Sequence, residues 1–218
     1  MRRSAARQAR RLAVALSALA AGCADDGPDG APPAGFASLR VVEVAAVPCD
    51  RPLASRGVGV VVADGVVATA AHTVDGARRE ITVDGAPAEV VALDARTDLA
   101  LLAAPVTGAA TLARDPTGSV TLHLPDHAVA VTVLDTGPLV VHDTTARARH
   151  RREVHTIQPG VADGTSGAPL VDQHGRVVGI VVLDHPADGT AFAVTGAELA
   201  ALRATDRVGS HAAPRCHE

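Results

Sequence analysis

The chain has 218 residues, enough for one or two domains with a sizeable hydrophobic core. Its formal net charge of -4 at pH 7 gives no basic excess, which argues against a nucleic-acid partner. With no Trp, no Tyr and only two Phe, the core must consist of Val, Leu, Ile and Ala.

Residues 1–22 predict a secretory signal peptide. The cationic stretch MRRSAARQARR precedes the apolar run LAVALSALAAG, which is too short to span a bilayer comfortably as a mature helix. The sequence LAAGC at the end of this run resembles a bacterial lipobox, which implies cleavage before Cys23 and lipidation of its thiol. The alternative is a plain exported protein that is cleaved near Ala21. We expect a protein of the bacterial cell envelope, periplasmic or on the surface, with the lipid as its only membrane anchor.

Residues 23–38 predict a flexible tether between this anchor and a folded domain. The stretch ADDGPDGAPPAGFAS is rich in Pro, Gly, Ala and Asp, a composition typical of linkers. We place the folded domain at residues 39–207 and a C-terminal tail, which contains Cys216, at residues 208–218.

The cysteines leave two possibilities open. If Cys23 is lipidated, Cys49 and Cys216 remain as an even number in an oxidising compartment and could form a disulfide. Chain entropy would make a bridge over so long a loop worth about 4–5 kcal/mol. The alternative is a metal site made by His211, Cys216 and His217, but this cluster lacks the fourth ligand and the spacing of a zinc site. We expect no metal and no cofactor.

From residue 39 onward, short runs rich in Val and Thr alternate with turn signals, as in an all-β fold. The pairs Asp64-Gly65 and Asp84-Gly85 predict hairpin turns, and residues 196–205 predict a helix. About a dozen strands are too many for one small barrel, so two packed barrels fit the length better. The predicted strand segments are 39–47, 57–71, 79–94, 98–105, 119–125, 128–135, 138–143, 153–158, 168–184 and 190–195.

Three side chains in these segments could act together as a catalytic unit. His72 lies in VVATAAHTVDG, Asp98 in DARTDLALL and Ser166 in ADGTSGAPLVD. Each residue alone has an ordinary structural explanation, in a turn or at a strand end. Together, however, an imidazole can accept the proton of a serine hydroxyl, and a buried carboxylate can orient the imidazole and stabilise its cation. The backbone N–H groups of Gly164 and Ser166 could then bind an oxyanion.

The motifs TAAH, TDLALL and GTSGAPLVD..G.VVGIV, in this order, resemble those of the chymotrypsin-fold serine proteases, in the style of the bacterial HtrA-like and secreted trypsin-like peptidases. The resemblance covers residues 41–202. It implies two packed six-stranded antiparallel β-barrels, split near residues 115–125, with a short C-terminal helix.

The resemblance also implies a function. His72 would be the general base, Asp98 its orienter and Ser166 the nucleophile of an acyl-enzyme mechanism that hydrolyses peptide bonds in proteins or peptides. It favours a disulfide between Cys49 and Cys216 over a metal site. The tail is too short for the PDZ module that many HtrA-like enzymes carry, and we expect a monomer.

The primary substrate pocket can be placed from the same resemblance. Its base would be Gly160, one wall would be Val182, Leu183 and Asp184, and the other wall would be Thr190, Ala191 and Phe192. With no carboxylate at the base, a preference for Arg or Lys is not supported. We expect a small or medium apolar side chain before the scissile bond, and Asp184 is the residue most able to change that preference.

Some residues depart from the family pattern. Thr165 precedes the nucleophile where Asp or Asn is usual, Ala168 replaces a glycine, and Val182 aligns with a serine that commonly braces the triad aspartate. These departures keep open an alternative function, a catalytically weak or inactive protease-fold module that binds or senses peptides. An α/β-hydrolase esterase is disfavoured, because that fold places a helix directly after the nucleophilic serine and the histidine downstream of it. Here a strand follows Ser166, and His72 lies upstream.

A basic run, ARARHRRE at residues 146–153, belongs to none of these motifs. We interpret it as a solvated loop, the usual environment of such a run of charges.

Overall fold

The computed structural model describes residues 39–49, 53–76, 78–116, 118–142, 149–185 and 187–205. The predicted signal peptide, the predicted lipidation site Cys23, the predicted tether, and the tail with His211, Cys216 and His217 lie outside these residues. Cys49 is disulfide-bonded, but the two other cysteines are both outside the described ranges, so its pairing with Cys216 stays a prediction. No helix within these ranges is long and apolar enough to cross a membrane.

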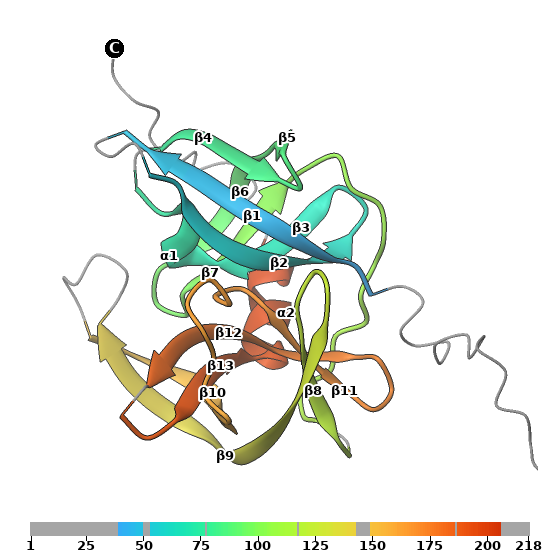
Figure 1. Cartoon of the computed structure of the whole chain (residues 1–218), viewed down its shortest axis with the longest axis vertical. Coiled ribbons are helices and arrows are strands. Elements are labelled where there is room, and N and C mark those ends of the chain that lie inside the picture. The colour runs from blue at the N-terminus through green and yellow to red at the C-terminus, as the bar shows by residue number, and fades with distance from the viewer. Residues whose placement is uncertain are drawn as a thin grey trace, which may run out of the picture. The chain divides into compact units, whose positions relative to one another are not determined.

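Seven antiparallel strands form the first sheet, in the order β5-β4-β1-β2-β3-β7-β6 (Figure 1). A single helical turn, α1 (Ala71–Val74), follows β3. The strands are β1 (Val41–Pro48), β2 (Ser55–Ala63), β3 (Val66–Ala70), β4 (Arg78–Val83), β5 (Ala86–Pro87), β6 (Glu89–Asp94) and β7 (Leu99–Ala103).

Both predicted hairpin turns are present. Gly65 takes a φ of 75° between β2 and β3, and Asp84 and Gly85 take φ values of 48° and 78° between β4 and β5. Positive φ at such positions is the reason that Asp-Gly pairs favour tight turns. The second hairpin is short, however, because β5 has two residues and the chain then continues into β6, which pairs with β7.

The second sheet closes into a six-stranded barrel in the order β10-β13-β12-β11-β8-β9. The helix α2 (Gly196–Ala204) follows the last strand. The predicted all-β class, with two sheets and a short C-terminal helix, is confirmed, and the first sheet exceeds the expected six strands by the two-residue β5. The strands are β8 (Val120–His123), β9 (Ala128–His142), β10 (Arg149–Gln158), β11 (Pro169–Asp172), β12 (Val177–His185) and β13 (Thr190–Thr195).

Strand β9 continues through the break that was predicted at residues 136–137. Residues 128–131 of β9 pair with β8, whereas residues 132–142 pair, among the described strands, only with β10. Pro138, which lacks an N–H group, therefore lies in a part of β9 with only one partner strand, where a proline is tolerated. The two predicted strands are consequently one strand of 15 residues.

Strand β10 begins at Arg149, four residues before the predicted start at Glu153. The interpretation of the basic run as a loop is therefore wrong for residues 149–153, which form a strand, although Arg149, Arg151 and Glu153 are exposed to solvent as expected. Residues 146–148 lie outside the described ranges. The cause is pairing with β9, which continues to the register Arg149 opposite His142. Within this strand Arg152 is 5% exposed.

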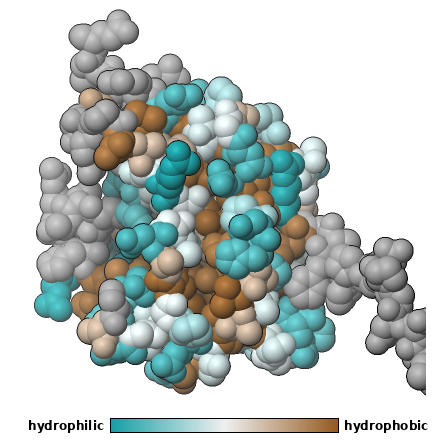
Figure 2. All heavy atoms as spheres, in the orientation of Figure 1, coloured by the Kyte–Doolittle hydropathy of each residue, from teal (hydrophilic) through white to brown (hydrophobic). Residues whose placement is uncertain are grey.

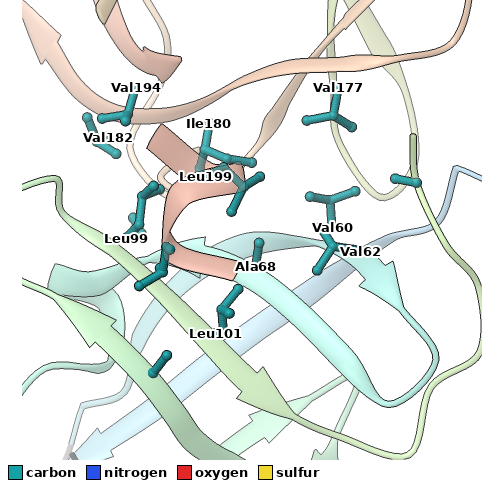
Figure 3. Close-up of a cluster of buried hydrophobic side chains, with 14 of the residues drawn as sticks. Val60, Val62, Ala68, Leu99, Leu101, Val177, Ile180, Val182, Val194 and Leu199 are labelled. Carbon is teal, nitrogen blue, oxygen red and sulfur yellow. The ribbon is translucent and has the colours of Figure 1, made fainter. Parts of the chain in front are cut away.

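An apolar cluster packs the two sheets against each other (Figure 3). Leu99 comes from β7, Ile180 from β12 and Leu199 from α2, and all three are fully buried. The helix α2 contacts β12 and β13 of the barrel as well as β6 and β7 of the first sheet. Burying one such side chain contributes about 1.5–3 kcal/mol, so the cluster holds both sheets in a defined relation.

On the face drawn in Figure 2, hydrophobic residues are interspersed with hydrophilic ones. Four large hydrophobic side chains within the described ranges are exposed, Leu53, Leu134, Val140 and Leu183. Of these, Leu183 belongs to strand β12 at the cleft described below.

A buried carboxylate holds the turn between β11 and β12. Asp172 is 1% exposed, and it accepts hydrogen bonds from the guanidinium of Arg176 at 2.6 and 2.9 Å and from the backbone N–H groups of His174 at 2.9 Å and Arg176 at 3.1 Å. Burial by itself would raise the pKa of Asp172, but the hydrogen bonds and the charge of Arg176 outweigh burial and hold this pKa below its usual value.

We expect Asp172→Asn to lower the free energy of unfolding by about 2 kcal/mol at pH 7, because Arg176 loses its anionic partner. Because the pKa of Asp172 is lower in the folded than in the unfolded state, its ionised carboxylate stabilises the protein at any pH above its unfolded-state pKa of about 3.9. This stabilisation is lost as the pH falls through the folded-state pKa. The difference between wild type and variant should therefore shrink below about pH 4. Denaturant unfolding at pH 7 and pH 3 measures both effects, and an undiminished difference at pH 3 would contradict the ion pair.

Candidate active site

Two hydrogen bonds join His72 to Asp98, beyond the end of β3 and before the start of β7 in the first sheet. The Nδ1–H of His72 donates to Asp98 Oδ2 at 2.8 Å, and the backbone N–H of His72 donates to Asp98 Oδ1 at 2.8 Å. A third bond runs from the N–H of Ala71 to the carbonyl of Asp98 at 2.9 Å. With Nδ1 donating, the neutral imidazole has Nε2 free to accept a proton.

Strand pairing brings these two residues together. Strands β3 and β7 are antiparallel neighbours, with Ala70 opposite Leu99, so the next residues beyond that pair lead to α1 on one side and to Asp98 on the other. Asp98 takes a φ of 62°, a left-handed conformation that is uncommon outside glycine but tolerated by Asp. The N–H of Asp98 donates to the carbonyl of Asp94 at 2.9 Å, which holds this conformation at the end of a turn.

An arginine outside the predicted site contacts the same carboxylate. Arg152 Nη1 lies 3.7 Å from Asp98 Oδ2 and donates to the carbonyl of Thr97 at 2.9 Å. Burial lowers the pKa of the Arg152 guanidinium, and the charge of Asp98 opposes that effect. A longer predicted strand would have identified Arg152, because it lies two residues from the buried Val154 and so on the same face.

Ser166 lies in a turn that closes on itself. The hydroxyl of Thr165 donates a hydrogen bond to the carbonyl of Ala162 at 2.6 Å, and the backbone N–H of Thr165 donates to the same oxygen at 3.3 Å. The N–H of Ala168 donates to the carbonyl of Thr165 at 2.9 Å. Thr165, which departs from the family pattern, therefore holds the turn through its side chain. Ala168 is fully buried in an apolar cluster that also contains Val58.

The turn is also attached to both sheets. The N–H of Val58 in β2 donates to the carbonyl of Ser166 at 2.8 Å, and the N–H of Gly167 donates to the carbonyl of Val181 in β12 at 2.7 Å. Gly167 takes a φ of 91°, and a Cβ atom there would overlap the carbonyl oxygen of Val58. Gly164 takes a φ of 86° with open space around it. Glycine is required at Gly167 for packing as well as for conformation.

His72, Asp98 and Ser166 line one cleft of about 460 Å³. The side chain of His72 is 40% exposed to solvent, whereas that of Asp98 is 9% exposed. From the barrel come Arg152, the segment 161–166, which includes Gly164, and the segment 181–184.

The predicted pocket residues fall into two groups. Val182, Leu183 and Asp184 line the cleft, whereas Gly160, Thr190, Ala191 and Phe192 do not. Gly160 nevertheless lies beside Asp184, because a Cβ atom on it would be 2.9 Å from Asp184 Oδ1. That oxygen accepts the N–H of Val161 at 3.2 Å. One carboxylate oxygen of Asp184 is thus used to hold the segment that leads to Ser166.

No group of three or more His, Cys, Asp or Glu side chains that could hold a metal occurs within the described ranges. The alternative metal cluster of His211, Cys216 and His217 falls outside them.

The protein-family model of the trypsin-like peptidase domain matches residues 57–180, which is more than half of the chain. The chain belongs to the trypsin-like peptidase family. The matched range of this peptidase contains His72, Asp98, Arg152 and Ser166. None of the curated proteins compared with the chain matches it.

Solved structures of related proteases share the fold of this trypsin-like peptidase. The active form of the Rv3671c protease from M. tuberculosis is 28% identical with a TM-score of 0.71, covering 83% of this chain and 84% of that chain. An inactive form of the Rv3671c protease is 27% identical with a TM-score of 0.62, and the match covers 79% of this chain and 90% of that chain. A variant of the HtrA-type protease AlgW with a tripeptide is 23% identical with a TM-score of 0.62, covering 80% and 62%. The predicted resemblance to chymotrypsin-fold, trypsin-like peptidases is confirmed, and the likeness to the HtrA-type protease AlgW is one of fold.

Proposed function

We propose that this peptidase is a serine endopeptidase with His72 as general base, Asp98 as its orienter and Ser166 as nucleophile. The observation that carries the proposal is the His72–Asp98 pair, which is joined by two hydrogen bonds and lines the same cleft as Ser166. A buried carboxylate that accepts from Nδ1 leaves Nε2 to act as the base, which is the division of roles in a catalytic triad.

In the proposed reaction, Oγ of Ser166 attacks the carbonyl carbon of the scissile bond while His72 Nε2 takes the hydroxyl proton. The N–H groups of Gly164 and Ser166 donate to the oxyanion that forms. His72 then gives its proton to the leaving amine, the C–N bond breaks and an acyl-enzyme remains. Water attacks the ester with His72 again as base, which releases the acid and restores Ser166. The bonds of Thr165 and Val58 support this assignment because they hold the turn rigid.

We propose protein or peptide substrates with a small or medium apolar side chain before the scissile bond. The support is the wall of the cleft, where Leu183 is 40% exposed and Val182 lies beside it. One carboxylate oxygen of Asp184 accepts a hydrogen bond from the N–H of Val161, which limits the ability of Asp184 to select a cationic substrate side chain. Cleavage of a mixed peptide library by the wild-type chain measures this preference, and dominant cleavage after Arg or Lys would contradict it.

We propose further that the chain is exported and anchored in the cell envelope through a lipid on Cys23. The support is the cationic and apolar stretch before LAAGC and the linker composition of residues 23–38. The folded domain at residues 39–207 would be a monomer, closed by a disulfide between Cys49 and Cys216. We expect a labelled fatty acid to be incorporated into the wild type and not into Cys23→Ser, and labelling of both would contradict the assignment.

Exposure of the full chain to a fluorophosphonate probe tests the proposed reaction without a known substrate. We expect one adduct, on the peptide that contains Ser166, with Ser166→Ala as the unlabelled control. A folded wild type that takes up no probe would contradict the endopeptidase. That result would favour the alternative, a module that binds or senses peptides, in keeping with Thr165, Ala168 and Val182 departing from the family pattern.

A further inference from the structure

We propose that Arg152 is a positioning residue for the reaction proposed above, on which this inference rests. Its charge, buried against Asp98, anchors the carboxylate from the opposite sheet and sets the pH at which His72 becomes an active base.

The contacts of Arg152 cross the boundary between the two sheets. The residue belongs to β10 of the barrel, whereas Asp98 and Thr97 precede β7 of the first sheet. Arg152 Nη1 donates to the carbonyl of Thr97 at 2.9 Å and lies 3.7 Å from Asp98 Oδ2. Oδ2 is also the atom that accepts from His72 Nδ1 at 2.8 Å. The cation therefore acts on the carboxylate oxygen that faces the imidazole.

This contact is buried and therefore electrostatically strong. The side chains of Arg152 and Asp98 are 5% and 9% exposed, and charges removed from water are weakly screened. Arg152 Nε is buried and has no hydrogen-bond partner among the residues that the structure describes, which is costly for a charged group. A buried cation with an unsatisfied donor suggests a role other than stability. The side chain of Val182, which the resemblance aligns with the bracing serine, is apolar and cannot donate a hydrogen bond to Asp98.

The charge has a predictable effect on the base. A carboxylate stabilises the protonated imidazole, which must form during the reaction, and also holds the resting imidazole protonated when the pH is low. A guanidinium on the same oxygen weakens that stabilisation. The neutral imidazole, which is the active form, should therefore persist to lower pH than it would without Arg152.

The other charged side chains around Asp98 and His72 are retained in every variant of Arg152. Asp163 and Asp184 line the cleft on the barrel side. Asp94, which precedes Asp98 in the turn, is ion-paired with Arg96 at 2.7 Å. Asp75 follows α1, and on the solvent face of β10 the side chains of Arg151 and Glu153 are 3.9 Å apart.

The test compares the rate of fluorophosphonate labelling of the full chain across pH in the wild type, Arg152→Gln and Arg152→Lys. Gln is neutral but keeps an amide donor, and Lys keeps the charge. Arg151→Gln is the matched control, because it removes the same charge one residue away, where the side chain is 68% exposed. Arg152→Met serves as a second neutral variant if Arg152→Gln does not fold, and circular dichroism establishes folding.

We expect the acidic midpoint of the labelling profile to move up by about one pH unit in the neutral variant. We also expect the plateau rate to fall by about tenfold, since Asp98 is then less firmly held. Arg152→Lys should stay near the wild-type midpoint, and so should Arg151→Gln. A merely structural role would lower the plateau and leave the midpoint in place.

The failures are distinguishable. A labelled wild type with the same acidic midpoint in the neutral variant overturns the role of Arg152 and leaves the proposed function standing. An equal shift in Arg152→Lys also overturns it, because the charge would not be the cause. An unlabelled, folded wild type overturns the proposed function, and this inference with it.

Discussion

Asp98→Asn should lower the rate of Ser166 labelling, and of peptide hydrolysis, by about 10⁴-fold. Asp98 uses both carboxylate oxygens as acceptors, one for the Nδ1–H of His72 and one for its backbone N–H. An asparagine offers one acceptor, so one of these donors must face an NH₂ group. If that donor is Nδ1, the imidazole takes the other tautomer and Nε2 can no longer accept the serine proton. The asparagine also leaves the buried charge of Arg152 without its partner.

Asp126→Asn is the matched control for this experiment. Asp126 Oδ1 also accepts from a histidine Nδ1, that of His127 at 2.7 Å, but the side chain is 83% exposed and lies outside the cleft. Its substitution should leave the labelling rate within about twofold, since exposed pairs contribute little. Labelling rates of both variants at saturating pH decide the matter, and a loss below tenfold in Asp98→Asn would refute its role as orienter.

Gly167→Ala is expected to abolish labelling and to lower the free energy of unfolding by about 4 kcal/mol or more. The added methyl group would overlap the carbonyl oxygen of Val58 in β2, and the residue would keep a φ of 91° that alanine disfavours. Relief of this overlap must move the turn away from β2, which breaks the bond from the N–H of Val58 to the carbonyl of Ser166. The nucleophile would then lose its position relative to His72.

Gly85→Ala separates the two costs. Gly85 has a φ of 78°, and apart from Gly85 and its two chain neighbours no described residue has an atom within 4 Å of the position that an added methyl group would take. Its substitution therefore costs the backbone conformation alone, about 1 kcal/mol. Denaturant unfolding of both variants gives the difference that comes from packing against β2. Equal losses in the two variants would show that the turn of Ser166 can move away from β2 at no cost.

Local features carried much of the fold prediction. Val-rich runs and the Asp64-Gly65 and Asp84-Gly85 pairs act over a few residues, so they predict hairpins wherever they occur. The course of β9 past Pro138 could not be predicted in this way. It depends on which side of the strand has a neighbour, and that neighbour is β10, which comes later in the chain.

The candidate site divides along the same line. The order and context of His72, Asp98 and Ser166 in the sequence predicted that they would act together, and all three line one cleft. Their roles stay proposals until labelling is measured. Arg152 was missed because a charge within a basic run is usually solvated. Only pairing of β10 with β9 extends the strand to Arg149 and turns Arg152 to the face that packs against the first sheet.

The sequence by itself determined the all-β class, the family resemblance and the three candidate residues, because strand composition, turn chemistry and motif order are local properties. The tertiary structure alone decided that Asp98 shares its oxygen between His72 and Arg152, and that the turn of Ser166 is attached to β2. Both features depend on contacts between residues from different sheets. Such contacts exist only once the apolar cluster around Leu99, Ile180 and Leu199 has joined the two sheets.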